Sequence, residues 1–222
     1  MTGSDALLQC LTNEGIDTVF GYPGGTIMPL YDKLYSYTDK LRHILTRHEQ
    51  GAVHAAQGYA RATGKVGVCM ATSGPGPTNL VTGMADAMID STPIVAITAQ
   101  VVARSLGTDE FQEVDIIGVT MPITKWNYQI TSADEIPEII AKAFYLARTG
   151  RPGPVLIDIT KDALVTEIAN FSYKPCEYVR GYYPYPKLNQ TEIDEAIKLI
   201  DNAKQPIIFA GHGVELSQAQ DE

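Results

Sequence analysis

The fold is decided by residues 66–79, which read Val-Gly-Val-Cys-Met-Ala-Thr-Ser-Gly-Pro-Gly-Pro-Thr-Asn. Residues 66–71 form a short apolar run that is typical of a strand buried on both faces. The glycines and prolines that follow interrupt both strand and helix, and an apolar pattern with helical spacing continues from Thr78 to Ile89. A buried strand that turns into a helix is the repeating unit of a parallel α/β sheet.

The same alternation extends on both sides of this stretch. Strands are expected at residues 17–20, 41–45, 66–71, 94–98 and 154–159, and helices at 2–14, 28–35, 48–62, 78–89 and 134–148. Apolar strands separated by long helices need cover on both faces, so the pattern predicts a doubly wound parallel α/β domain. We assign residues 1–163 to this domain.

The pattern changes after residue 163. Residues 164–190 are interpreted as a linker, because residues 174–187 contain three prolines and four tyrosines. Tyrosines that alternate with proline more often pack along a domain surface than form a stacking platform. A helix is expected again at 192–202 and a strand at 206–210. One helix and one strand cannot bury a core, so residues 191–222 are interpreted as the beginning of a second α/β domain of a longer protein.

Composition and charge exclude several classes of protein. The 222 residues are 45% hydrophobic and 19% charged, which is enough apolar material for a folded core. The 17 Lys and Arg residues are scattered and outnumbered by 26 Asp and Glu, so a nucleic-acid partner is not expected. No apolar run approaches the roughly 20 residues that span a bilayer, and a cytoplasmic protein without a membrane segment is expected.

Cysteine and histidine spacing gives no sign of a metal site or a disulfide framework. Cys10, Cys69 and Cys176 are odd in number and far apart in the sequence. The four histidines lack the spacing of a zinc protease. We therefore expect no metal site formed by this chain alone.

Two turns carry candidate chemistry. Glu49 follows the strand at 41–45 and begins a helix, which would place its carboxylate at the sheet edge where open α/β folds bind ligands. Stabilisation by the helix dipole alone remains an alternative for this residue. Residues 72–79 lack the third glycine and the lysine of nucleotide-binding motifs, and their prolines remove amide donors. A rigid loop that holds a flat ring fits this turn better than a nucleotide site.

Together, the motifs resemble a known family. They comprise residues 21–25 (Gly-Tyr-Pro-Gly-Gly), 47–52 (Arg-His-Glu-Gln-Gly-Ala), 58–61 (Gly-Tyr-Ala-Arg), 72–79, 107–113, 124–126 (Thr-Lys-Trp) and 150–155 (Gly-Arg-Pro-Gly-Pro-Val). In this order they resemble the N-terminal part of the catalytic subunit of acetolactate synthase (acetohydroxyacid synthase), a thiamine-diphosphate enzyme. The resemblance extends from Met1 to about Asp162, and the ordered set is far more specific than any single motif.

The resemblance implies a pyrimidine-binding domain and a reaction. In this family pyruvate is decarboxylated and joined to a second 2-oxo acid, pyruvate or 2-oxobutanoate, in branched-chain amino acid biosynthesis. The implied cofactors are thiamine diphosphate, Mg²⁺ with its ligands in a C-terminal domain, and FAD. The implied assembly is a homodimer or higher homo-oligomer with sites shared between subunits, and a regulatory small subunit is allowed. Residues 1–222 alone are expected to be inactive.

The resemblance also implies roles for individual residues. Glu49 matches the acid that hydrogen-bonds the aminopyrimidine ring. Gln112 and Lys161 are the other implied catalytic residues; Phe111 and Gln112 would line the substrate pocket, and Lys161 would face its entrance. The implied contacts to thiamine diphosphate are Tyr22, Pro23, Gly24, Gly25, Glu49, Pro75 and Asn79, and Arg151 is the implied contact to FAD.

Three positions depart from the family pattern. Pro77 stands where the family has a smaller residue, Ala99 where glycine is common, and Thr160 where proline is frequent. We expect these changes to alter loop stiffness rather than chemistry.

Two other functions remain open. One alternative is another thiamine-diphosphate enzyme, such as a pyruvate oxidase or a 2-oxo acid decarboxylase. The other is a non-catalytic α/β module that binds a nucleotide or a protein. Residues 111–113 and 124–126 favour the synthase.

Overall fold

The computed structural model describes residues 1–221 and contains two compact units, of which the first runs from Met1 to Pro184 and the second begins at Tyr185. The first unit contains a six-stranded parallel sheet with the order β2-β1-β3-β4-β6-β5. The strands are β1 (Thr18–Gly21), β2 (Arg42–Leu45), β3 (Gly67–Ala71), β4 (Ile94–Gln100), β5 (Trp126–Ile130) and β6 (Pro154–Thr160). The predicted doubly wound parallel α/β fold is confirmed.

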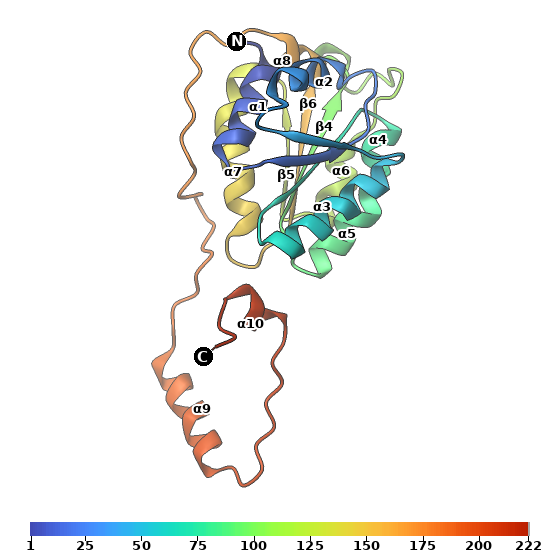
Figure 1. Ribbon diagram of the computed structural model, residues 1–222. Helices are drawn as coiled ribbons and strands as arrows, with labels where there is room; N and C mark the ends of the chain where they lie inside the picture. Colours follow the sequence, from blue (N-terminus) through green and yellow to red (C-terminus); the bar gives the residue numbers. More distant parts are fainter. Residues whose placement is uncertain (222) are drawn as a thin grey trace. The chain divides into compact units, whose positions relative to one another are not determined.

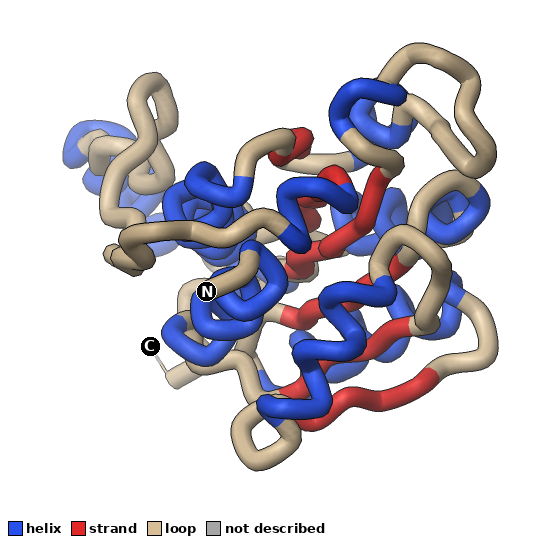
Figure 2. Tube along the Cα trace, turned by 90° about the horizontal axis from the view of Figure 1, so that it is seen from above, coloured by secondary structure: helices blue, strands red, loops and turns tan. Residues whose placement is uncertain are grey.

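Helices cover both faces of the sheet, and Figures 1 and 2 show the strands as a layer between them. One face is covered by α1 (Gly3–Asn13), α2 (Met28–Leu34), α7 (Ile136–Arg148) and α8 (Lys161–Val165). The other is covered by α3 (Glu49–Thr63), α5 (Val81–Ile89) and α6 (Ile116–Thr120), with the short α4 (Pro75–Thr78) before α5. Short 3₁₀ turns occupy Tyr35–Tyr37, Ala103–Ser105, Met121–Ile123 and Ala133–Glu135.

Each central strand contributes to two apolar cores. In β3, Val68 and Met70 join the core beneath α1 and α7, whereas Cys69 and Ala71 join the core beneath α3 and α5. Successive side chains of a strand point to opposite faces, so a strand with helices on both faces must be apolar throughout. This is why residues 66–71 form a continuous apolar run.

Strand β5 is absent from the sequence prediction. It lies at the edge of the sheet and pairs only with β6. Trp126 and Tyr128 pack against the core beneath α1 and α7, while Asn127 lies on the other face and donates from Nδ2 to the Ile117 carbonyl oxygen at 2.6 Å. The signal in the sequence is therefore an apolar-polar alternation rather than an apolar run.

The second unit contains α9 (Gln190–Asn202) and α10 (His212–Leu216). The strand expected at 206–210 is wrong: no strand is assigned to these residues, and Ile207, Ile208 and Phe209 are exposed. A strand needs a neighbour to satisfy its backbone donors and acceptors, and residues 185–221 provide none at this segment.

Part of the segment after residue 163 packs within the first unit. Phe171, Tyr173, Val179 and Tyr182 contact the core beneath α1 and α7. The Tyr182 hydroxyl donates to the Thr149 carbonyl oxygen at 2.6 Å. The compact unit therefore extends to Pro184.

The first residues of the chain are hydrogen-bonded to the segment that follows α8. The Gly3 amide donates to the Thr166 carbonyl oxygen at 2.9 Å, and the Ile168 amide donates to the Met1 carbonyl oxygen at 2.8 Å. Thr2 and Glu167 form an antiparallel bridge between them. These contacts close the sheet unit at one corner. None of the helices in residues 1–221 combines the length and the apolarity needed to cross a membrane.

Candidate active site

The loops that follow the strands meet at one edge of the sheet, because the carboxyl ends of parallel strands share an edge. Residues 22–27 follow β1, residues 46–48 follow β2, and residues 72–74 follow β3. The 101–115 loop follows β4, and Lys161 follows β6. Every predicted site residue except Arg151 therefore lies at this edge.

Glu49 is the first residue of α3, and only 8% of it is exposed. His48 caps the helix by accepting a hydrogen bond from the Gln50 amide at Nδ1, over 3.1 Å. The Asn79 side chain donates from Nδ2 to Glu49 Oε2 at 3.0 Å. No residue in 1–221 donates a hydrogen bond to Oε1, and a Cβ built on Gly76 would lie 3.6 Å from that atom. Oε1 is the carboxylate oxygen available to a ligand.

Two threonines join the loops that follow β1 and β3. The hydroxyls of Thr26 and Thr72 are 2.9 Å apart, and Thr26 Oγ1 accepts a hydrogen bond from the Ser73 amide at 3.0 Å. The Thr26 amide donates to Thr72 Oγ1 at 3.3 Å. Gly24 lies against Thr72, so the 22–25 loop is held beside the loop that carries Asn79.

We expect Gly24→Ala to lower the free energy of unfolding by about 1–3 kcal/mol, because overpacking a filled site costs this much. A Cβ at this position would lie 2.4 Å from Cβ and Cγ2 of Thr72. Gly25→Ala is the matched control, since nothing lies within 4 Å of a Cβ there. Denaturant titration of both variants measures the difference. Equal unfolding midpoints would show that the contact between Gly24 and Thr72 is unimportant.

The 101–115 loop approaches the turn after β3. A Cβ on Gly74 would lie 2.8 Å from the Gln112 carbonyl oxygen and 2.9 Å from its Cα, so the two backbones are in close contact. Gln112 itself has a φ of 62°. The Glu113 carboxylate accepts hydrogen bonds from the Gly107 amide at 2.5 Å and the Asp109 amide at 2.9 Å, which fold the loop back on itself.

The structure thus brings Gln112 beside the turn that carries Asn79, which in turn contacts Glu49. Pro75 is exposed on that turn, and Gly76 is buried. Phe111 is 84% exposed and packs against no core in the described chain. Lys161 is exposed at the start of α8.

Arg151 lies at the opposite edge of the sheet. It precedes β6, and Glu49 lies at the edge where the strands end, which is called the Glu49 edge below. The seven residues of β6 separate Arg151 from this edge by about 20 Å at the usual rise of a strand. Its Nε donates to Ser91 Oγ at 2.8 Å, and its Nη2 donates to the carbonyl oxygens of Ile89 at 2.9 Å and Met88 at 3.3 Å. Arg151 therefore caps the end of α5 and is not brought together with the other predicted site residues.

Residues 1–119 match the family "Thiamine pyrophosphate enzyme, N-terminal TPP binding domain", where TPP is another name for thiamine diphosphate. The match covers more than half of the chain. The chain belongs to this family. The matched residues include the loops after β1 to β4, and with them Glu49, Asn79 and Gln112.

Relatives of this TPP binding domain have similar sequences over nearly the whole chain. The large subunit of acetolactate synthase from Corynebacterium glutamicum is 54% identical over 222 residues, which are 100% of this chain and 35% of the relative. The acetolactate synthase of Mycobacterium bovis is 52% identical over 222 residues, 100% of this chain and 36% of the relative. The large subunit from Lactococcus lactis is 47% identical over 220 residues, 99% of this chain and 38% of the relative. The chain thus spans little more than a third of these relatives.

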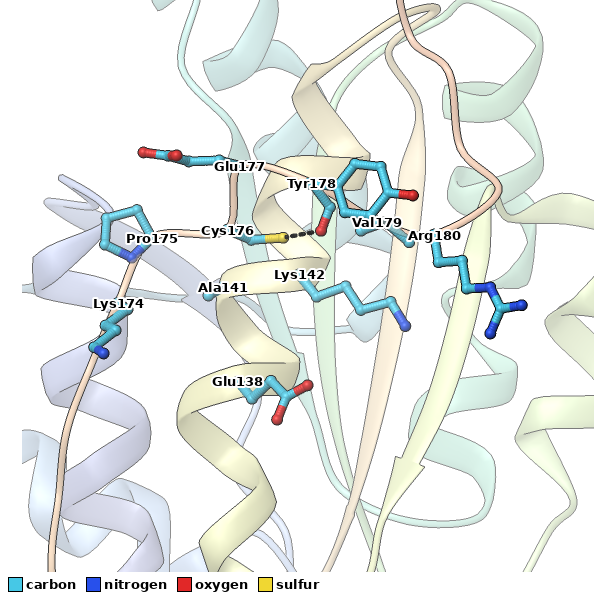
Figure 3. A pocket seen from close by; sticks show the side chains of 10 residues that line it. All are labelled: Glu138, Ala141, Lys142, Lys174, Pro175, Cys176, Glu177, Tyr178, Val179 and Arg180. Carbon is cyan, nitrogen blue, oxygen red and sulfur yellow. Dashed lines mark hydrogen bonds between the residues drawn. The ribbon is translucent and has the colours of Figure 1, made fainter.

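A pocket of about 410 Å³ in the first unit lies beside α7. It is open to solvent and lies between α7 and residues 174–180, where Figure 3 shows Lys142 of the helix and Arg180 of the facing segment. None of the predicted site residues lines it. Within residues 1–221, no three or more His, Cys, Asp and Glu side chains are grouped so that they could hold a metal ion.

Two aromatic side chains lie beneath the Glu49 edge. The rings of Tyr31 and His43 meet edge to face with their centroids 5.1 Å apart. Burial raises the pKa of Tyr31, and the negative charge of Glu49 adds to this effect. Burial lowers the pKa of His43, which favours its neutral form.

The first unit also buries an acid that the sequence analysis does not predict. Asp158 lies within β6 and is completely buried. Burial raises the pKa of Asp158 to about 6, although hydrogen bonds from Thr98, Gln129 and Gln100 oppose this shift. The signal in the sequence is a single acidic residue within the otherwise uncharged run 154–160.

Proposed function

We propose that the chain is the N-terminal part of an acetolactate synthase large subunit and binds the pyrimidine portion of thiamine diphosphate. The observation that carries this proposal is the identity of 47–54% to acetolactate synthases over 99–100% of the chain. The arrangement of Glu49 and Asn79 supports it, because both lie at the ligand-binding edge of the sheet.

The residues at this edge fit the cofactor. Glu49 is buried and offers Oε1 to a donor, and Gly76 leaves that oxygen uncovered. When bound, thiamine diphosphate supplies a nucleophilic carbon and accepts the electron pair that stays behind when carbon dioxide leaves. Glu49 would hold and move a proton at a pyrimidine ring nitrogen, and exclusion of water strengthens such a hydrogen bond.

The other residues would orient the cofactor and the substrate. Asn79 would fix the Glu49 carboxylate through its bond to Oε2, and Pro75 would stiffen the turn beside the ring. The backbone of residues 22–25 would approach the reacting centre. Gln112 and Phe111 would line the pocket for pyruvate and the second 2-oxo acid.

The proposed active enzyme is a homodimer or a higher homo-oligomer in the cytoplasm, with Lys161 facing the substrate entrance. Exposed apolar side chains at the Glu49 edge support this assembly: Tyr22 is 40% exposed, Leu45 60% and Phe111 84%. Solvent-exposed apolar side chains gathered at a site favour cover by a second subunit. A regulatory small subunit remains compatible with the proposal.

Mg²⁺ and FAD complete the proposed cofactors, with their main sites outside this chain. The Mg²⁺ ligands would belong to a further domain. Arg151 would provide one contact to FAD. Its Nε and Nη2 are already used to cap α5, whereas Nη1 makes no hydrogen bond within the described residues.

The test is to identify the products of the full-length protein. It is supplied with pyruvate, thiamine diphosphate, Mg²⁺ and FAD, with and without 2-oxobutanoate. We expect acetolactate, together with the mixed acetohydroxy acid when 2-oxobutanoate is present. Acetaldehyde or acetyl phosphate would instead assign a sibling thiamine-diphosphate activity, and the absence of turnover would favour a non-catalytic module.

A further inference from the structure

A row of polar side chains crosses three strands on the face covered by α3, α5 and α6. Asp158 of β6 is the direct cross-strand partner of Thr98 in β4 and of Gln129 in β5. Gln100 follows Thr98 by two residues and therefore lies on the same face. Asp158 and Thr98 are completely buried, and Gln100 is 2% exposed. A polar row of this kind is costly unless every group finds a partner.

All three neighbours donate a hydrogen bond to Asp158. Thr98 Oγ1 donates to Oδ1 at 2.7 Å, and the amides of Gln100 and Gln129 donate to Oδ2 at 3.2 and 3.0 Å. A carboxylate that meets only donors is satisfied in its ionised form. The backbone ladders already join β4, β5 and β6, so the sheet does not require this network for its pairing.

Gln100 connects Asp158 to the loop that carries Gln112. Its Nε2 also donates to the Val114 carbonyl oxygen at 2.9 Å, and its Oε1 accepts a hydrogen bond from the Val101 amide at 2.9 Å. One buried side chain thus holds the 101–115 loop near both of its ends. The Gln100 amide that donates to Val114 also donates to Asp158, so Asp158 helps to hold the Gln100 side chain in place.

We propose that Asp158 is a positioning residue that acts through Gln100 to set the base of the 101–115 loop, and with it the place of Gln112 beside Gly74. The role of Gln112 in substrate binding rests on the proposed function. The placement of the loop itself does not, because it follows from hydrogen bonds within the chain.

A second tether limits the size of the effect. The Ala103 amide donates to the Asp162 carboxylate, at 3.1 Å to Oδ1 and 3.2 Å to Oδ2. Asp162 makes no hydrogen bond to Asp158 or Gln100. Loss of the Asp158 network would therefore displace the loop without releasing it.

The two glutamines that bond to Asp158 allow an effect on the position of the 101–115 loop to be separated from an effect on the stability of the protein. Gln129 donates to Asp158 but has no bond to the 101–115 loop, whereas Gln100 bonds to both. Gln129→Ala thus serves as the matched control for Gln100→Ala. Asp158→Asn is the conservative variant, since its side-chain oxygen accepts from both glutamine amides and its amide donates to the Thr98 hydroxyl.

The kinetic test uses the full-length enzyme with pyruvate. We expect Asp158→Ala and Gln100→Ala each to raise KM and lower kcat, with kcat/KM reduced about 3- to 30-fold. A misplacement of 1 Å can cost about 10²-fold, and the Asp162 tether keeps the displacement smaller. The double variant should lose little more than either single variant, since both act through one contact. Gln129→Ala and Asp158→Asn should stay within about threefold of the parent kcat/KM. An equal loss in Gln129→Ala, or no loss in Gln100→Ala, overturns the proposal.

A second readout is independent of activity. Amide hydrogen exchange of residues 101–115 in the full-length protein should be faster in Asp158→Ala and Gln100→Ala than in Gln129→Ala. If Asp158→Ala does not fold, the comparison of Gln100→Ala with Gln129→Ala decides whether the network positions the 101–115 loop. If the parent protein has no synthase activity, the proposed function fails and the exchange measurement still decides the positioning role. Unchanged exchange in Gln100→Ala overturns it.

Discussion

Glu49→Gln in the full-length protein is expected to lower kcat by about 10²–10⁴-fold, the contribution that a positioned acid or base makes to catalysis. Glutamine keeps the size of the side chain and can still accept the hydrogen bond from Asn79 through its carbonyl oxygen. It cannot exchange a proton with a ring nitrogen of the cofactor. The measurement is steady-state turnover of pyruvate at saturating thiamine diphosphate and Mg²⁺.

Glu138→Gln is the matched control for this variant. It makes the same chemical change on an exposed carboxylate of α7, which covers the opposite face of the sheet from α3, and should leave kcat unchanged. Thermal unfolding of Glu49→Gln should remain close to that of the parent, since the buried position loses a charge and keeps its shape. Full activity of Glu49→Gln would contradict the role of Glu49 in catalysis.

Gly74→Ala is expected to lower the free energy of unfolding by about 2–4 kcal/mol, the combined cost of a left-handed alanine and an overpacked contact. Gly74 has a φ of 65°, and its added Cβ would meet the Gln112 backbone at 2.8–2.9 Å. The backbone of Gln112 has to move to relieve this contact. We therefore also expect kcat/KM for pyruvate to fall at least about tenfold, since the loop beside the site is displaced.

Gly64→Ala separates the cost of a left-handed alanine from the cost of the overpacked contact. Gly64 has a φ of 70°, and nothing lies within 4 Å of a Cβ built there. It ends α3, about 22 Å along the helix from Glu49 at 1.5 Å per residue. This variant should lose about 1–2 kcal/mol from its backbone conformation alone and keep its kcat/KM. If denaturant titration and kinetics give the same result for both variants, the contact between Gly74 and Gln112 has no effect of its own.

The sequence predicted the central strands well because they are buried on both faces. Strands β3, β4 and β6 have neighbours on both sides in the sheet and read as mainly apolar runs, with Asp158 as their one charged residue. Strand β5 has one neighbour and mostly half-buried residues, so an apolar run could not reveal it. The strand expected at 206–210 failed for the opposite reason: its residues are apolar, but residues 185–221 give it no partner.

The sequence also located the loops of the candidate site, since parallel strands bring their carboxyl ends to one edge. It could not show which side chains meet there, because this depends on contacts between distant segments. The bond between Asn79 and Glu49 joins residues 30 positions apart, and the Thr26 and Thr72 hydroxyls are 46 positions apart. Arg151 stands outside the group because it precedes its strand, whereas Glu49 and Lys161 follow theirs.

The bridge between Thr2 and Glu167 brings together two segments that are far apart in the sequence. The start of α1 and the segment that follows α8 therefore lie side by side at one corner of the α/β layers, although the whole sheet lies between them along the chain. Domains whose distant segments meet at the surface tolerate circular permutation and insertion. An insertion at this corner would therefore leave both apolar cores intact.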